Sequence, residues 1–324
     1  MLSSLSVRIG KLNLKNPVMV ASGTFGYAEE FADFIDLRSL GALVTKTITL
    51  APRQGNLPPR TCETPAGLLN SIGLENPGWE IFVEEKLPCL KKLGIPVIVS
   101  IASEDEPEEF VILAKQLDKV KEVAAIELNI SCPNIKVHSS EFRVHSRRLQ
   151  TTNYKLRTKL ISQDPKATYN LVKAVRKVTK KTLITKLSPN VASITDIARA
   201  SEAAGSDAVS LINTITGMSI DVETRKPKIA SITGGLSGPA IRPIAVHMVW
   251  QAYKKIKIPI IGMGGIIDIS SALEFIIAGA TAISVGTANF INPKVCLEII
   301  AGLKRYLIKN KIKDISTLIG SLKI

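Results

Sequence analysis

The chain has 324 residues, 45% of them hydrophobic, and a net charge of +14. This size and hydrophobic content suit one large domain or two ordinary ones, and the charge suits a lysine-rich surface, an anionic ligand or an acidic protein partner. Aromatic residues make up only 5% and are not interleaved with arginine, which argues against nucleic-acid binding.

The sequence also argues against membrane, disulfide and metal classes. It contains no run of eighteen or more apolar residues, so we expect no membrane span. Its start, MLSSLSVRIGKLNLKNP, lacks the apolar core of a signal peptide, and we expect a cytoplasmic protein. The few histidines make a metal site unexpected. The wide spacing of the cysteines excludes CxxC motifs and argues against a disulfide framework. The cysteines are Cys62, Cys89, Cys132 and Cys296.

In chain order, the first predicted element is a small hairpin over 6–16, where apolar residues alternate around a Gly-Lys turn. Short β-branched runs follow, most of them separated by amphipathic helical patterns. The runs are 17–20, 42–46, 96–100, 125–129, 183–187, 208–212, 258–262 and 282–286. The clearest helical patterns are 108–119, 167–178, 194–204 and 270–278.

Near-continuous apolar strands joined by helices indicate a parallel sheet with helices outside. Eight such units close into a barrel whose functional residues lie at the carboxyl ends of the strands. We therefore predict an α/β fold, a single (β/α)8 TIM barrel over 1–324, with the hairpin closing its bottom. A doubly wound open sheet is the alternative.

A polar or glycyl residue stands at the carboxyl end of each predicted strand, where a core position would be apolar. Two of them are lysines in apolar surroundings, which need negative partners. These positions are Ser22, Lys46, Ser100, Asn129, Lys186, Asn213, the glycines of 262–265, and Gly286 with Thr287.

The last two predicted strands end in GMGG (262–265) and GT (286–287), each followed by a helix-like stretch. Glycine lets a backbone approach a phosphate closely, and the amides at the start of a helix point at the anion. Because these loops form the usual phosphate site of such barrels, we predict a phosphorylated cofactor here.

Cys132 lies just past the fourth predicted strand, among the polar residues Asn129, Ser131 and Asn134. Cys89 and Cys296, in apolar helical patterns, are better explained as small buried hydrophobes. Cys132 is a candidate nucleophile or general base, whose ordinary pKa of about 8.5 would have to approach the working pH. Its position alone does not choose between the two roles.

Seven motifs, in order along nearly the whole chain from about 5 to 320, resemble those of the dihydroorotate dehydrogenases. The class 1B catalytic subunit of pyrimidine biosynthesis is the most similar type. The motifs are NSIGLENPG (70–78), NISCPN (129–134), KLSPNV (186–191), INT (212–214), ITGGLSGPAIRP (232–243), IGMGG (261–265) and VGTANF (285–290).

The resemblance implies oxidation of dihydroorotate to orotate on FMN, one per chain, with Cys132 as the base that removes the C5 proton. It implies that Lys46 lies between substrate and flavin and that Lys186 lies beside the N1/O2 edge of the flavin. The implied substrate contacts are Lys46, Asn70, Ser71, Ile72, Gly73, Leu74, Asn129, Asn213 and Thr214. The implied flavin contacts are Ser22, Lys46, Thr47, Ser100, Asn129, Lys186, Ile212, Gly238, Gly264, Gly265, Gly286 and Thr287.

The sequence departs from the family pattern after Lys136. The segment 137–163 is about twenty residues longer than the resemblance suggests and contains no glycine; from Lys136 to Gln163 there are seven Lys or Arg against one Glu. This basic insertion lies in the loop that should close over the site. Its interpretations are a disordered or loosely helical surface insertion, an altered lid, a docking surface for an acidic partner or a sequence that has drifted. Ser100 also stands where many relatives have asparagine.

For partners, the resemblance implies a homodimer of this chain joined by two iron–sulfur and FAD subunits, which carry FAD and [2Fe-2S] and pass electrons to NAD. The alternatives are a fumarate-dependent class 1A enzyme, a flavoenzyme like dihydropyrimidine dehydrogenase or tRNA-dihydrouridine synthase, and an FMN-binding protein with impaired catalysis.

Overall fold

The computed structural model describes residues 3–103, 106–131 and 160–324. Cys132 and residues 137–159 of the predicted insertion lie outside the described residues. Of the insertion, only 160–163 is described, and it includes the short helix η4 (Ile161–Gln163).

The centre of the fold is a parallel eight-stranded sheet in the order β3-β16-β15-β10-β9-β8-β7-β4. A parallel bridge between Met19 and Ala42 joins the first strand to the last and closes the sheet into a barrel. The prediction of an α/β TIM barrel is confirmed, and the open-sheet alternative is wrong. The strands are β3 (Val18–Val20), β4 (Leu43–Val44), β7 (Val97–Ile101), β8 (Val123–Asn129), β9 (Thr182–Lys186), β10 (Ala208–Leu211), β15 (Ile260–Met263) and β16 (Ala282–Val285).

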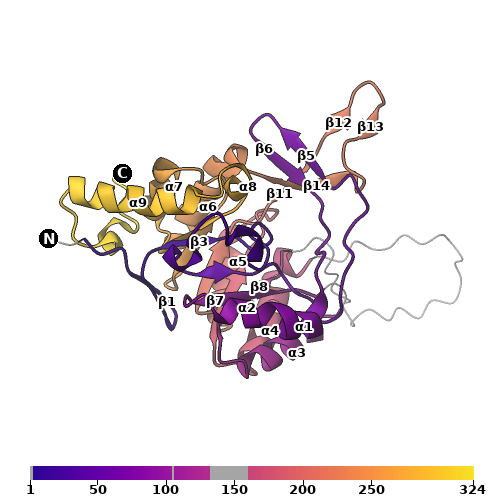
Figure 1. The fold of residues 1–324 in the computed structure, drawn as a ribbon, viewed down its shortest axis with the longest axis horizontal. Coiled ribbons are helices and arrows are strands. Elements are labelled where there is room, and N and C mark those ends of the chain that lie inside the picture. The colour runs from indigo at the N-terminus through magenta and orange to yellow at the C-terminus, as the bar shows by residue number, and fades with distance from the viewer. Residues whose placement is uncertain (1–2, 104–105, 132–159) are drawn as a thin grey trace, which may run out of the picture.

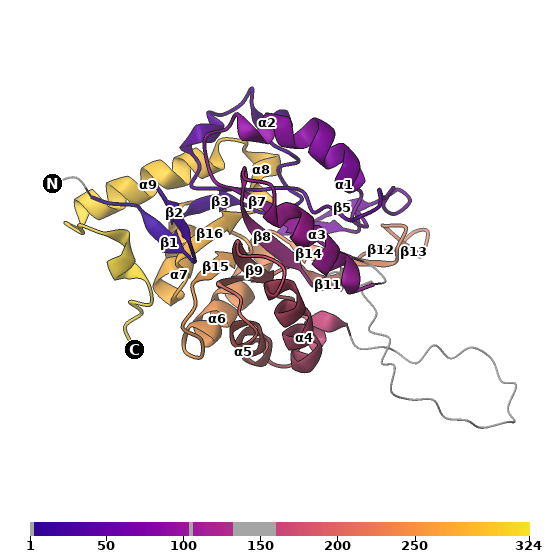
Figure 2. The ribbon, with the colours of Figure 1, turned by 90° about the horizontal axis from the view of Figure 1, so that it is seen from below.

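Helices surround the barrel, as Figure 2 shows. They turn apolar faces inward; α4, for example, buries Leu171, Val172 and Val175, and Asp164 caps its start by accepting from the amides of Lys166 and Ala167. The four helical segments predicted from the sequence are confirmed within a few residues. The helices are α1 (Gly78–Ile81), the π-helix η3 (Phe82–Lys86), α2 (Leu87–Lys91), α3 (Glu108–Asp118), α4 (Pro165–Arg176), α5 (Ile194–Ala203), α6 (Arg242–Tyr253), α7 (Ile269–Ala278), α8 (Ala288–Ile291) and α9 (Val295–Lys309). Further short 3-10 helices are η1 (Glu29–Phe31), η2 (Leu37–Ser39), η5 (Pro239–Ile241) and η6 (Ile315–Leu318).

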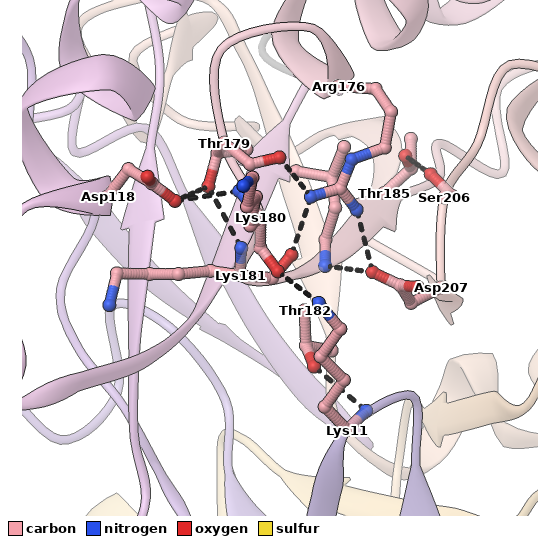
Figure 3. A network of polar contacts seen from close by, with 11 residues as sticks. Lys11, Asp118, Arg176, Thr179, Lys180, Lys181, Thr182, Thr185, Ser206 and Asp207 are labelled. Atoms are coloured by element: carbon pink, nitrogen blue, oxygen red, sulfur yellow. Dashed lines mark hydrogen bonds and ion pairs between the residues drawn. The ribbon is translucent and has the colours of Figure 1, made fainter.

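The predicted N-terminal hairpin is confirmed as β1 (Val7–Ile9) paired antiparallel with β2 (Leu12–Leu14). Its turn lies at the amino-terminal end of the barrel, because the Lys11 amide donates to Thr182 Oγ1, at the start of β9, at 3.0 Å. Figure 3 shows the polar network there, which links Lys11 and Thr182 to Arg176 and Asp207. The hairpin therefore closes the bottom of the barrel, as expected.

A second sheet was not predicted from the sequence. Four antiparallel strands in the order β11-β14-β6-β5 form a sheet outside the barrel, and β12 and β13 form a separate pair (Figure 1). Along the chain, β5 and β6 follow β4, whereas β11 and β14 follow β10, so the sheet belongs to loops at the carboxyl ends of the barrel strands. Its strands are β5 (Thr61–Thr64), β6 (Gly67–Asn70), β11 (Ile215–Met218) and β14 (Thr233–Ser237), with β12 (Ile220–Asp221) and β13 (Lys226–Pro227) beyond them.

Among the described residues, none of the helices is both long enough and apolar enough to cross a bilayer.

Candidate active site

The two lysines singled out in the sequence both lie at carboxyl ends of barrel strands. Lys186 ends β9 and is only 4% exposed, and its Nζ donates to Ser22 Oγ, just past β3, at 3.0 Å. Lys46 follows β4 and is half-buried, with its amide donating to the Gly26 carbonyl at 2.9 Å. Within the described part of the chain, the Lys46 ammonium has no hydrogen-bond or ion-pair partner. The mouth of the barrel therefore has two cations, and an anionic ligand bound there would neutralise them.

Thr47, Ser100 and Asn129 form one buried polar cluster at the ends of β4, β7 and β8. Thr47 Oγ1 lies 3.0 Å from Ser100 Oγ and accepts a hydrogen bond from Asn129 Nδ2 at 3.3 Å. Ser100 Oγ donates to Glu127 Oε1 at 3.1 Å, inside the barrel. Three residues that the family resemblance matched to flavin contacts are thus brought together, and the Glu127 carboxylate, which the sequence analysis did not single out, supports them.

The cluster continues from Asn129, at the end of β8, to Asn213, which follows β10. Asn129 Oδ1 accepts from Ser131 Oγ at 2.9 Å, and Ser131 Oγ accepts from Asn213 Nδ2 at 2.5 Å. Ser131 is 8% exposed and directly precedes Cys132, which lies outside the described residues. Two of the predicted substrate amides are therefore joined through the residue next to the predicted base.

Thr214 and Asn70 both contact Gly235 of β14 in the outer sheet. Asn70 Nδ2 donates to the Gly235 carbonyl at 3.2 Å. A Cβ atom added to Gly235 would lie 2.1 Å from Thr214 Oγ1, so Thr214 packs against the same residue of β14. The loop at 212–214 is further fixed by Asn190, whose Nδ2 donates to the Thr214 carbonyl at 3.1 Å.

The loop that follows Asn70 carries the other predicted substrate contacts. Gly73 and Leu74 have φ angles of 77° and 56°, a conformation that favours glycine and is unusual for leucine. Asn76 holds the loop by donating to the Leu74 carbonyl at 2.7 Å and accepting from the Thr49 amide at 3.1 Å. Ser71 Oγ is buried without a hydrogen-bond partner among the described residues. A hydroxyl in this state suits a ligand atom at the end of the loop.

The glycines predicted to cradle a phosphate lie at the ends of β15 and β16, and Gly238, predicted as a further flavin contact, lies at the end of β14. Gly238 and Gly265 have φ angles of 95° and 74°, and a Cβ atom at Gly265 would lie only 2.7 Å from the Gly238 carbonyl oxygen. Gly264, with φ of 128°, packs against Ala245, where an added Cβ would come within 2.8 Å. Glycine is therefore required for these backbones to pack together.

The loop after β16, which carries Gly286 and Thr287, leaves more room for an added Cβ atom. Among the described residues, a Cβ atom at Gly286 would meet only Ala21 and Thr24, at 3.7 and 3.8 Å, and Thr287 Oγ1 donates to Ser237 Oγ at 2.8 Å. Ile212 is buried beside this region and its amide donates to the Met263 carbonyl at 2.9 Å. Two lysines, several amides and this glycine cradle are a donor set that fits FMN, which has a phosphate and a polar pyrimidine edge.

The remaining cysteines take no part in this arrangement. Cys296 is buried, and its burial raises the pKa of the thiol to about 12, as expected for an inert core residue. Cys89 is only partly buried, so the prediction of a core position is wrong for it, because its side of α2 stays accessible. Among the residues that the structure describes, no cluster of His, Cys, Asp or Glu has the composition of a metal site.

Three residues of the site were missed by the sequence analysis: Glu127, Asn76 and Asn190. Asn76 and Asn190 lie inside the motifs NSIGLENPG and KLSPNV, so their motifs signalled them. Glu127 had a weaker signal, a single charged residue within an apolar strand. Such a charge needs buried partners, and the sequence does not show which residues supply them.

The comparisons with known proteins agree with this geometry. The profile of the family described as dihydroorotate dehydrogenase matches residues 4–307. The "Dihydroorotate dehydrogenase B (NAD(+)), catalytic subunit" of Trichlorobacter lovleyi is 49% identical over 320 residues, covering 99% of each chain. The proteins of the same name from Thermoanaerobacter pseudethanolicus and Geotalea daltonii are 49% and 50% identical, covering 99% of this chain and 99% and 98% of theirs. The chain belongs to the dihydroorotate dehydrogenase family.

Proposed function

We propose that this chain is an FMN-dependent dihydroorotate dehydrogenase that oxidises (S)-dihydroorotate to orotate in UMP biosynthesis. The observation that carries the proposal is the meeting of Lys46, Lys186, the asparagine amides and the glycine cradle at one end of one barrel. Family membership and the names of full-length relatives at about 49% identity support the same reaction.

The roles of the residues follow from the chemistry of the substrate. Cys132 takes the proton from C5, and the electron pair left there forms the C5–C6 double bond. The chemistry supplied by bound FMN is acceptance of the hydride that leaves C6. Asn70, Asn129, Asn213 and Thr214 hold the pyrimidine ring and its carboxylate, because amides and hydroxyls offer paired donors and acceptors.

The cofactor contacts are assigned to the other strand ends. Lys186 places a cation at the pyrimidine edge of the flavin, and Lys46 places one between flavin and substrate. The cradle of Gly264, Gly265, Gly286 and Thr287 would receive the phosphate, with Ser22, Thr47, Ser100, Ile212 and Gly238 as further contacts. The whole of 1–324 then forms one FMN-binding barrel domain.

We also propose the organisation of a class 1B enzyme. The printed name of the relatives, a catalytic subunit linked to NAD(+), supports a partner subunit. In this proposal two copies of the chain form a homodimer that binds two subunits carrying FAD and [2Fe-2S], in the cytoplasm. Electrons leave through that partner to NAD.

The decisive experiment uses the full chain, loaded with FMN and mixed anaerobically with dihydroorotate while the visible absorbance of the flavin is followed. We expect bleaching for the wild type. The matched control is Cys132→Ala, which should bind FMN equally well and bleach at least a hundredfold more slowly, because removal of a general base costs about 10²–10⁴ in rate. A flavin-loaded wild type that does not bleach would refute dihydroorotate oxidation by this chain alone.

A further inference from the structure

The barrel interior contains a carboxylate that the proposed reaction does not use. Glu127, on β8, is 2% exposed. Its Oε1 accepts a hydrogen bond from Ser100 Oγ on β7 at 3.1 Å, and its Oε2 accepts one from Ser210 Oγ on β10 at 3.0 Å. Burial of an isolated carboxylate is costly, so these hydroxyls stabilise it and it in turn fixes where their hydrogens point.

One of these two hydroxyls begins a chain of hydrogen bonds that reaches the candidate active site. Ser100 Oγ has a single hydrogen, which it donates to Glu127. In the 3.0 Å contact with Thr47, therefore, Ser100 accepts and Thr47 donates. Because the Thr47 hydrogen is used there, Thr47 Oγ1 presents a lone pair to Asn129 Nδ2, 3.3 Å away.

The series of hydrogen bonds continues from Asn129 to Ser131 and Asn213. Since its amide nitrogen faces Thr47, its Oδ1 faces Ser131 and accepts from Ser131 Oγ at 2.9 Å. Ser131 Oγ then accepts from Asn213 Nδ2 at 2.5 Å, which leaves Asn213 Oδ1 to accept from the Thr214 amide at 2.9 Å. Every bond in this series donates toward Glu127.

We infer that Glu127 is a positioning residue: as the terminal acceptor of this series, it sets the orientation of the Asn129 and Asn213 amides that face the substrate. The inference rests on the proposed function. If the carboxylate is lost, Ser100 is free to donate to Thr47, and Thr47 can then turn its hydrogen toward Asn129. An amide that flips in response exchanges its donor and acceptor ends and no longer matches a pyrimidine edge.

Ser210 provides a matched control. Like Ser100 it is a fully buried serine that donates one hydrogen bond to Glu127, but it lies on the other carboxylate oxygen and outside the series. Ser100→Ala and Ser210→Ala therefore remove the same group from similar surroundings. Only the first disconnects Glu127 from Thr47 and the amides.

The test measures orotate affinity of the FMN-loaded full chain, through the change in the flavin spectrum, alongside FMN affinity and thermal unfolding. We expect Glu127→Leu and Ser100→Ala to raise the orotate dissociation constant about tenfold, and Ser210→Ala to change it less than twofold. In Glu127→Gln the orotate dissociation constant should stay within about threefold of the wild-type value, because the amide oxygen of the new side chain can accept from Ser100 while its NH2 group donates to Ser210.

Other outcomes overturn the inference in distinguishable ways. Equal weakening of orotate binding by Ser100→Ala and Ser210→Ala would reduce Glu127 to a structural role. Weakened orotate binding in Ser100→Ala, with orotate binding unchanged in Glu127→Leu, would show instead that Ser100 acts through its proposed cofactor contact and not through Glu127. Failure of the wild type itself to bind orotate would overturn the proposed function and, with it, the substrate that the amides are said to recognise.

Discussion

Lys186 places an ammonium group in the buried mouth of the barrel, where charged side chains are rare. Only 4% of it is exposed, and within the described residues its Nζ has one hydrogen-bond partner, the neutral Ser22 hydroxyl. A buried ammonium is costly without a negative group. An anionic or polar edge of a cofactor beside the ammonium would offset this cost. Substitution of Lys186 therefore tests the cofactor site directly.

We expect Lys186→Met to raise the FMN dissociation constant tenfold or more, since a hydrogen bond to a charged group contributes about 1.5–3 kcal/mol. The control is Lys181→Met. Lys181 is also partly buried, but at the amino-terminal end, where its Nζ donates to the carbonyls of Val120 and Val123 at 2.8 and 2.7 Å. Quenching of flavin fluorescence measures both affinities. Equal FMN affinity for Lys186→Met and wild type would remove Lys186 from the cofactor site.

Gly265 permits a second test at the same scale. Its φ of 74° and its approach to the Gly238 carbonyl exclude a Cβ atom. Gly94 has a φ of 66°, but no atom of the residues that the structure describes lies within 4 Å of a Cβ added there. Alanine at either position should destabilise the chain by about 1 kcal/mol through backbone strain. Only Gly265→Ala should also weaken FMN binding by tenfold or more, because only there must the cradle move. Denaturant unfolding and FMN titration separate the two effects.

At the scale of elements, the two ends of the barrel have different tasks. The amino-terminal end is held by polar contacts between the hairpin and the loops that enter the strands, as Figure 3 shows. Asp118, at the end of α3, accepts from Thr179 Oγ1 and from the Lys180 amide, both at 2.7 Å. Arg176 and Asp207 pair at 2.8 Å, and Asp207 also accepts from the Leu183 amide. Residues at this end of such barrels contribute to stability rather than chemistry.

The pH dependence of stability follows from Asp118. Burial alone would raise the pKa of Asp118, but the hydrogen bonds from Thr179 and Lys180 outweigh it and hold the pKa below its ordinary value. A carboxyl whose pKa is lower in the folded state stabilises the fold above its unfolded pKa, about 3.9, and loses that contribution as the pH falls through the folded pKa.

We therefore expect Asp118→Asn to lower the free energy of unfolding by roughly 1 kcal/mol at neutral pH, and the difference from wild type to shrink below about pH 4. Urea unfolding across this range checks the result, and FMN affinity measured at neutral pH should not change. A difference that grows as the solution is acidified would have the wrong sign and would contradict this account of Asp118.

The elements also show what can be read from the sequence. The barrel strands and helices were predictable because each is a local pattern: β-branched runs for the strands, and apolar residues at helical spacing for α3, α4, α5 and α7. The outer sheet was not, because its strands are short and rich in glycine and polar residues, as in TGGLS (233–237). It depends on pairing between Asn70 and Gly235, far apart in the chain, which leaves no local signal.

The same distinction applies to the candidate site. The sequence predicted the site residues Lys46, Lys186, Asn129, Asn213 and Gly265 from strand ends and glycine motifs. This was possible because all carboxyl ends of the strands lie on the same face of a barrel. The partners of Glu127 could not be predicted, since Ser100 lies opposite it only in the particular register of β7 with β8, and Ser210 lies on β10, which is separated from β8 by β9. Roles that depend on distance between strands, rather than on place along one strand, need the folded structure.

At the scale of the whole molecule, the barrel presents one end for chemistry and must pass two electrons onward after each oxidation. The relatives' name links the catalytic subunit to NAD(+), and the proposed route runs through a separate subunit that carries FAD and [2Fe-2S]. If this route is correct, the chain alone can be reduced by dihydroorotate but has no efficient path to NAD.

We expect the isolated chain, loaded with FMN, to turn over with ferricyanide as electron acceptor and to reduce NAD at least a hundredfold more slowly. Mixing it with the iron–sulfur and FAD subunit should restore dihydroorotate-dependent NADH formation, while the same complex made with Cys132→Ala should not form NADH. Steady-state absorbance assays measure all three reactions. Rapid NAD reduction by the isolated chain would contradict the need for a partner, and turnover with fumarate alone would favour the class 1A alternative. Because the Cys132→Ala complex keeps the electron route and loses only the proposed base, it separates a failure of chemistry within the barrel from a failure of electron transfer between subunits.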